Sequence, residues 1–218
     1  MFFLIPLCLI LAGTFIWQEK EEKYVNAVIL KGTASLCFVI LGFLNGNGSG
    51  TARLLCYGLA VGAIADVLLN LRYVFAEKGK LVFLIGILVF LSGHLLYLAA
   101  IVPLASAPVV CVLAGAVLSA LLLKWIFGRI EAQMAFKIFG IFYIGAIVIM
   151  NSFALSNLFT MPSSFTGIFF AGALLFLISD IVLILNTFGP ASRFSLRRTN
   201  LTLYYIGQIL IAVSLLFL

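Results

Sequence analysis

Charged residues are scarce in this sequence, and it has no room for a separate polar domain. Asp, Glu, Lys and Arg make up 9% of the 218 residues, hydrophobic residues make up 65%, and the mean hydropathy is +1.29. A soluble domain is about one quarter charged, so the composition indicates an integral membrane protein. The net charge of +6 does not indicate a nucleic-acid partner, because the basic residues lie mostly in loops between apolar runs.

The motifs of metal sites and serine hydrolases are also absent. No cluster of His, Cys and carboxylates has metal-ligand spacing, and no GxSxG elbow occurs. The four cysteines are dispersed in or at the ends of apolar segments, where we expect small buried hydrophobes: Cys8, Cys37, Cys56 and Cys111. We therefore predict that the protein uses no metal and no other cofactor.

Long apolar runs, in contrast, cover most of the chain. A membrane-spanning helix takes about 20 residues, so eight fit and leave short loops. The sequence predicts an all-α, polytopic membrane protein with a single integral membrane domain over residues 1–218. The eight predicted spans are 2–17, 24–44, 52–71, 81–102, 106–125, 136–155, 166–187 and 201–218.

The distribution of basic residues predicts the orientation of these spans. The loops after the first, third, fifth and seventh spans hold eleven of the 13 Lys and Arg residues. The positive-inside rule places these loops in the cytosol and both termini on the non-cytosolic side. Short loops, compact length and the lack of a retention signal favour a bacterial inner membrane.

The two halves of the chain resemble each other. An offset of 114 residues aligns Asp66 with Asp180, the only aspartates. The same offset aligns two further pairs, Gly58 with Gly172 and Gly93-His94 with Gly207-Gln208. We predict half-repeats over about 1–105 and 106–218. Because each holds four spans, they form a 4+4 parallel repeat, whose third and seventh spans face each other across a central cavity.

Asp66 lies inside an apolar segment on a stripe of small and polar residues. Gly58, Gly62, Asp66 and Asn70 are spaced four residues apart, so one helix face carries all of them. Small residues at this spacing let a second helix approach closely. An acid near the middle of the bilayer costs about 2.5–3.5 kcal/mol, which favours a functional role.

Other polar residues are predicted at a similar depth. Lys31, Asp66 and Asp180 all fall roughly 8–10 Å inside the cytosolic boundary at 1.5 Å per residue, and Gln208 joins them. Lys31 is either a buried counter-ion or a side chain that extends to the surface. A lone aspartate could form only a structural hydrogen bond, but two at matching places favour a functional cavity.

The remaining intramembrane polar residues are supporting candidates. His94 shares a helix face with Tyr97 and is as compatible with packing as with proton transfer. Tyr204 and Tyr205 lie one turn before Gln208. Asn70 and Tyr97 are predicted to support the charged residues.

Five segments in order carry a resemblance to a known family. They are Lys31-Gly-Thr-Ala-Ser35, Gly62-Ala-Ile-Ala-Asp66-Val-Leu-Leu69, Phe90-Leu-Ser-Gly-His94-Leu-Leu-Tyr97, Ser179-Asp180-Ile-Val-Leu183 and Tyr204-Tyr205-Ile-Gly-Gln208. Together they resemble the YhhN family of eight-span membrane proteins, whose characterised members are lysoplasmalogenases. Family members more often have Gly where this chain has Ala65, and often Pro where it has Gly32.

The resemblance implies hydrolysis of the sn-1 vinyl ether of a lysoplasmalogen to a fatty aldehyde and glycerophosphoethanolamine or glycerophosphocholine. Protonation of the vinyl β-carbon gives an oxocarbenium ion that water captures, so two carboxylates can divide the acid and anion roles. We predict Asp66 and Asp180 as this catalytic pair, without assigning the acid. Lys31 would keep one ionised or bind the substrate phosphate, and His94, Tyr205 and Gln208 would orient water or the headgroup.

The competing prediction is a proton-coupled transporter, because half-repeats with buried acids also suit a carrier. For the enzyme, the expected partners are the lysophospholipid substrate and membrane lipids, and the cavity should open toward the cytosolic leaflet. The sequence indicates no oligomeric state.

Overall fold

The computed structural model describes all 218 residues and contains helices but no strand, which confirms the predicted all-α fold. Its α-helices are α1 Leu4–Lys20, α2 Tyr24–Asn45, α3 Gly50–Val74, α4 Gly79–Ile101, α5 Pro108–Phe127, α6 Met134–Thr160, α7 Ser164–Phe188 and α8 Phe194–Ser214. Seven of them, α2 to α8, are long and apolar enough to cross a membrane. With 17 residues α1 is shorter, so its crossing stays a prediction.

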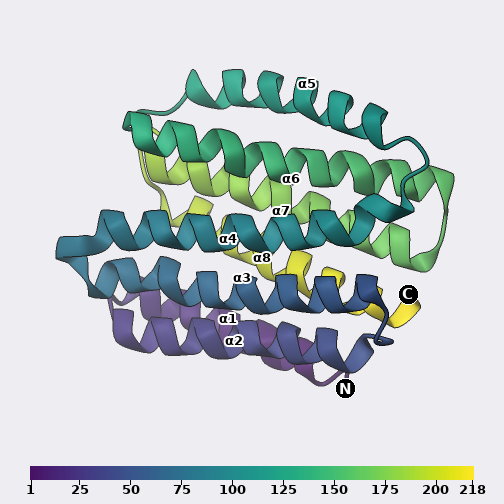
Figure 1. Cartoon of the computed structure of the whole chain (residues 1–218). Helices are drawn as coiled ribbons and strands as arrows, with labels where there is room; N and C mark the ends of the chain where they lie inside the picture. The colour runs from purple at the N-terminus through teal and green to yellow at the C-terminus, as the bar shows by residue number, and fades with distance from the viewer.

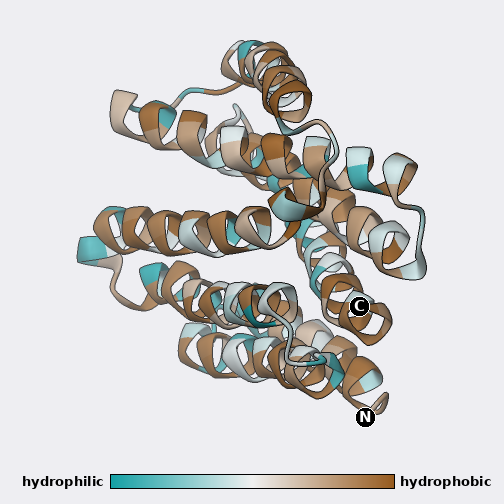
Figure 2. Cartoon of the chain, turned by 45° about the vertical axis from the view of Figure 1, so that its right-hand side comes forward, coloured by the Kyte–Doolittle hydropathy of each residue, from teal (hydrophilic) through white to brown (hydrophobic).

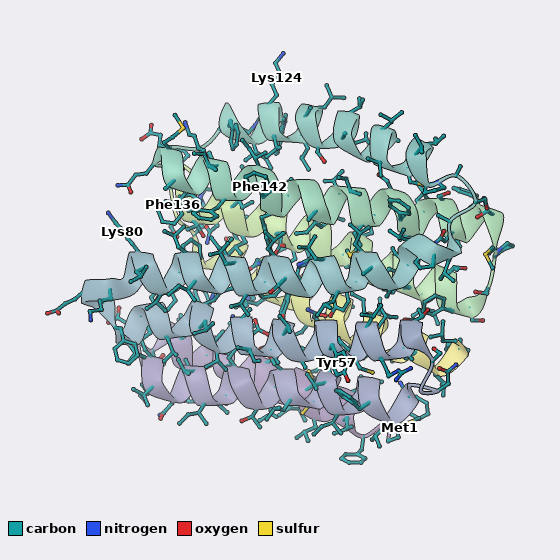
Figure 3. The ribbon with its side chains drawn as sticks, in the orientation of Figure 1. Met1, Tyr57, Lys80, Lys124, Phe136 and Phe142 are labelled. Carbon is teal, nitrogen blue, oxygen red and sulfur yellow. The ribbon has the colours of Figure 1, made fainter.

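The helices run back and forth along a bundle whose two termini lie at the same end (Figure 1). We call the opposite end the basic end; its turns join α1 to α2, α3 to α4, α5 to α6 and α7 to α8. Figure 2 shows mostly apolar helices, with hydrophilic residues gathered at the turn between α3 and α4. Lys80 lies at the basic end and Met1 at the other (Figure 3).

Packing between the helices is uneven. α3 packs most extensively against α4, and α7 against α8, whereas the only extensive contact of α5 is with α6. α5 accordingly lies at one edge of the bundle (Figure 1). Two of the helices that start at the end with the termini have serine caps. Ser49 accepts a bond from the Ala52 amide, and Ser163 forms a capping box with Thr166.

Glycine pairs allow the closest approaches between helices. A Cβ built on Gly58 would lie 3.1 Å from the Gly93 carbonyl oxygen, and one on Gly93 would lie 3.3 Å from that of Gly58. Gly172 and Gly207 meet in the same way, at 2.8 and 2.9 Å. These four residues are the glycines that the 114-residue offset aligns. The backbones of α3 and α4, and of α7 and α8, can therefore approach closely only because no side chain intervenes.

The beginning of α8 differs from the sequence prediction. The predicted span starts at residue 201, where the apolar run begins, but the helix starts at Phe194. Hydropathy assigned the polar stretch before 201 to a loop. In the structure two of its residues, Arg197 and Asn200, are instead helical and turned toward other helices, where their side chains are hydrogen-bonded.

Gly172→Ala should destabilise the protein. The new Cβ would meet the Gly207 carbonyl oxygen at 2.8 Å and the Ile211 amide nitrogen at 3.1 Å, and neither backbone atom can move alone. Overpacking of this kind typically costs about 1–3 kcal/mol. Thermal unfolding of the purified protein in detergent measures the loss.

Gly145→Ala in α6 is the matched control, because a Cβ there meets no atom within 4 Å. We expect it to leave stability unchanged or slightly higher, since Ala favours a helix over Gly. Equal melting temperatures for the two variants would contradict the close crossing at Gly172.

Candidate active site

Asp66 lies about two turns before the end of α3 and is the centre of a polar cluster. Its Oδ1 is 3.2 Å from the Lys31 ammonium nitrogen. Its Oδ2 accepts hydrogen bonds from the Ser35 hydroxyl at 2.6 Å and the Tyr204 hydroxyl at 2.5 Å. Lys31 and Ser35 are one turn apart on α2, so both face α3. Lys31 is only 3% exposed, and it is therefore a buried counter-ion that does not extend to the surface.

Asp180 on α7 has different surroundings. It is 3% exposed, and its Oδ2 accepts one hydrogen bond, at 2.6 Å, from the Tyr143 hydroxyl of α6. No Lys or Arg forms an ion pair with it; the two ion pairs of the structure are Lys31–Asp66 and Arg197–Glu19. The two aspartates thus occupy matching places in the sequence but have unlike electrostatic partners.

Both aspartates line one small cavity of about 30 Å³. Its wall combines charged and hydroxyl groups with apolar side chains: Lys31, Asp66, Leu69, Arg72, Phe83, Phe90, Tyr143, Asp180, Leu183, Arg197, Asn200, Leu201 and Tyr204. A cavity needs roughly 10–15 Å³ of such volume to hold one water molecule, so one or two water molecules fit beside the carboxyl groups.

A chain of polar contacts connects Lys31 to the basic end. The Asn70 Oδ1 lies 3.4 Å from the Lys31 Nζ, and the Asn70 Nδ2 donates to Glu19 at 3.1 Å. Arg197 binds the same Glu19 carboxylate with two nitrogens, at 2.7 and 2.9 Å. Asn70 therefore contacts Lys31 directly. The bonds of Glu19 to Asn70 and Arg197 join α1 to α3 and α8.

Gln208, Tyr97 and Tyr205 lie behind this cavity and do not line it. The Tyr97 hydroxyl donates to the Gln208 Oε1 at 2.9 Å, and the Gln208 Nε2 donates to the Tyr204 hydroxyl at 3.4 Å. The Tyr205 hydroxyl reaches the Lys31 carbonyl oxygen at 3.5 Å. Tyr97 and Gln208 thus contact the aspartate cluster only through Tyr204, which is itself part of the cavity wall.

His94 does not reach the cavity. Its Nδ1 lies 2.8 Å from the Phe90 carbonyl oxygen, and its ring packs against Phe176 with centroids 4.5 Å apart. Its Nε2 is buried and has no hydrogen-bond partner. The structure places His94 among aromatic rings, which fits the packing interpretation of this residue.

An apolar cavity of about 50 Å³ adjoins the polar one. Leu69, Phe83, Phe90, Tyr143 and Leu183 line both. The apolar cavity lies between α4, α6 and α7 and is covered by the end of α5 and the turn that follows it. Figure 3 shows one of its aromatic residues, Phe136, between α4 and α6. A polar site with an apolar neighbour suits an amphiphilic ligand.

Several residues that line the polar cavity or bond to its charged groups were not among the candidates from the sequence. Ser35 had a usable signal, because it follows Lys31 by one turn. Glu19 and Arg197 were assigned to loops, although both are helical and largely buried. Tyr143 is the only tyrosine of α6, but nothing in the sequence connects its hydroxyl to Asp180 on α7. No group of three His, Cys, Asp or Glu side chains could hold a metal ion.

A family model, described as the YhhN family, matches residues 26–215. The chain belongs to the YhhN family. The comparisons with curated proteins and with solved structures gave no match. In this YhhN protein the matched region includes every residue that lines the polar and apolar cavities, whereas Glu19 lies outside it.

Lys31→Met should destabilise this YhhN protein strongly, because it leaves the buried Asp66 carboxylate without its counter-charge. Removing one partner of a buried ion pair costs about 3–5 kcal/mol. The double variant Lys31→Met/Asp66→Asn removes both charges and should lose much less. Unfolding of the four proteins in detergent forms a double-mutant cycle. Losses that add, with no coupling between the two positions, would contradict the ion pair.

Proposed function

We propose that this YhhN protein is a lysoplasmalogenase that hydrolyses the sn-1 vinyl ether of lysoplasmalogens. One observation carries the proposal: two buried aspartates with unlike partners line a single polar cavity that adjoins an apolar one. Family membership is consistent with this hydrolase. The reaction releases a fatty aldehyde and a glycerophospho-alcohol.

The chemistry of a vinyl ether requires the groups that meet here. Nucleophilic attack does not cleave it directly; a proton must first add to the β-carbon, which gives an oxocarbenium ion at the α-carbon. Water then adds to the α-carbon, and the resulting hemiacetal collapses to the aldehyde and the free alcohol. A proton donor, an anion near the cation and a base for the water are therefore needed, as in glycoside hydrolysis.

The different partners of the two aspartates support a division of these roles between them. Asp66 is paired with the Lys31 ammonium and accepts hydrogen bonds from two hydroxyl groups, and it is the proposed anion that stabilises the oxocarbenium ion. Asp180 has only the Tyr143 hydroxyl, and a buried carboxyl group without a counter-charge favours the neutral, protonated form. Asp180 is thus the proton donor, and the carboxylate it becomes accepts a proton from the attacking water.

The apolar cavity is the proposed place of the alkenyl chain. Its volume of about 50 Å³ is far below that of a long chain, so entry requires its walls to move. α5 is the helix best suited to do so, because its only extensive contact is with α6 and its last residues cover the cavity. The chain would then extend from the aspartates toward the lipid beside α5.

We also propose the parallel 4+4 repeat around this cavity, with the basic end in the cytosol of a bacterial inner membrane. The matching glycine crossings Gly58–Gly93 and Gly172–Gly207 support the repeat. So do the corresponding contacts of α2 with α8 and of α6 with α4. The concentration of Lys and Arg at the basic end supports the orientation.

Asp66→Asn and Asp180→Asn should each lower aldehyde release from a lysoplasmalogen by about 100-fold or more, because each removes an acid–base or anionic group. Purified protein in detergent is sufficient for the assay, and transport could not produce aldehyde there. Ser119→Ala is the matched control, since Ser119 is also buried but bonds only within α5. Near-normal turnover in either folded aspartate variant would overturn the assignment.

Hydrolysis in D₂O should place one deuterium on the aldehyde carbon next to the carbonyl, because the first step protonates the vinyl β-carbon. The aldehyde is reduced with borohydride as it forms and is analysed by mass spectrometry. Authentic aldehyde incubated with the protein in D₂O measures exchange after release. Product without deuterium would rule out β-carbon protonation.

A further inference from the structure

A third cavity, of about 380 Å³, opens at the basic end beside the polar one. Residues of α1, α2, α3, α7 and α8, and of the turn before α8, line it, and Arg72 and Arg197 belong to the walls of both cavities. We call this third cavity the mouth. It lies where the polar cavity meets the surface of the bundle.

The mouth carries an excess of positive charge. Three guanidinium groups line it, those of Arg72, Arg193 and Arg197, against the single carboxylate of Glu19, which leaves two positive charges. Both Glu19 oxygens already bind Arg197, and one also binds Asn70. The charges of Arg72 and Arg193 are therefore not compensated by any carboxylate in the structure.

Arg72 is held rigidly in the wall between the two cavities. Its guanidinium lies over the rings of Tyr73 and Phe83, with centroid distances of 4.6 and 4.3 Å, and donates to the Tyr73 hydroxyl at 2.6 Å. Its Nε is buried and has no hydrogen-bond partner. A cation that is oriented by stacking but lacks an anion is prepared to bind one.

The beginning of α8 adds amide donors to the same place. Arg193 is the N-cap residue, its amide donates to the Asn186 Oδ1 at 2.7 Å, and no side chain caps the helix. The next amides, those of the first turn of α8, have no acceptor. Unpaired amides at a helix N-terminus favour anions, and phosphate above all.

We propose that the mouth binds the phosphate of a single-chain phospholipid, with Arg72, Arg193 and the first turn of α8 as its ligands. Arg72 follows Asp66 by six residues on α3, a rise of about 9 Å. Because Arg72 lines both cavities, a phosphate bound to it lies close to the aspartates. Lys31, which the sequence left open as a phosphate ligand, instead serves Asp66. The position of the ether at the aspartates rests on the proposed function; the phosphate site itself does not.

The test measures binding without catalysis. A radiolabelled lysophospholipid with a saturated sn-1 ether, which cannot be hydrolysed in this way, is titrated against the full-length protein in nanodiscs. Arg72→Gln and Arg193→Gln should each weaken binding about tenfold or more, as expected for a lost charge-assisted hydrogen bond. A 1-O-alkylglycerol of the same chain length, which lacks the phosphate, should bind weakly and equally to all variants.

A matched control shows whether an effect belongs to the mouth. Arg198→Gln removes the same charge from an exposed neighbour on α8 that does not line the mouth. It should bind the saturated ether like the unaltered protein. If Arg72→Gln does not fold, Arg193→Gln decides the question, because Arg193 is exposed.

The outcomes separate this site from the proposed reaction. Equal binding by all variants would overturn the phosphate site, even if aldehyde is formed. Binding that depends on Arg72 and Arg193 in a protein that releases no aldehyde would support the site and overturn the hydrolase. Binding of inorganic phosphate to the same variants is measured as well. If it binds through these arginines while the lipid analogue binds without them, the mouth takes free phosphate and the lipid proposal is wrong.

Discussion

The ion pair between Lys31 and Asp66 is the interaction on which the rest of the site depends. Two charges removed from water are tolerated only when their attraction and additional hydrogen bonds offset the desolvation. Asp66 receives those bonds from Ser35 and Tyr204, and Lys31 lies close to Asn70. The groups come from α2, α3 and α8, so satisfying one pair fixes the relative position of three helices.

The two aspartates have unlike partners, although a single offset aligns them in the sequence. Each lies near the end of a helix that crosses its neighbour through glycines. The 114-residue offset, however, aligns Lys31 with Gly145, so the second half has no cation at that place. Because only the first half has this lysine, Asp66 has a counter-charge, whereas Asp180 has a single tyrosine as its partner.

The sequence predicted the helices well because membrane helices must be long and apolar, and hydropathy measures that property directly. It also predicted a similar depth for Asp66, Asp180 and Lys31, since the rise per residue converts spacing into depth, and all three line the polar cavity. The beginning of α8 was missed because its first turns are polar. Partners such as Tyr143 and Glu19 could not be predicted, because a contact between distant helices leaves no periodic signal in a single sequence.

These missed turns of α8 supply part of the polar cavity wall. A hydropathy threshold treats a polar helix end as a loop, yet Arg197 and Asn200 contact buried groups there because other helices provide partners. His94 shows the opposite case. Its rarity drew attention, but aromatic rings surround it, and the cavity lies elsewhere. Rarity of a residue type and participation in a cavity are separate properties.

The bond between Glu19 and Arg197 joins the first helix to the last, and this has a consequence for assembly in the membrane. Seven helices are synthesised before α8, which brings Arg197 for Glu19 and Tyr204 for Asp66. Until then Glu19 lacks its cation, and Asp66 has Lys31 and Ser35 alone. The arrival of α8 is therefore the step that completes the polar interior, because a chain that ends before α8 has neither the Arg197 cation for Glu19 nor the Tyr204 hydroxyl for Asp66.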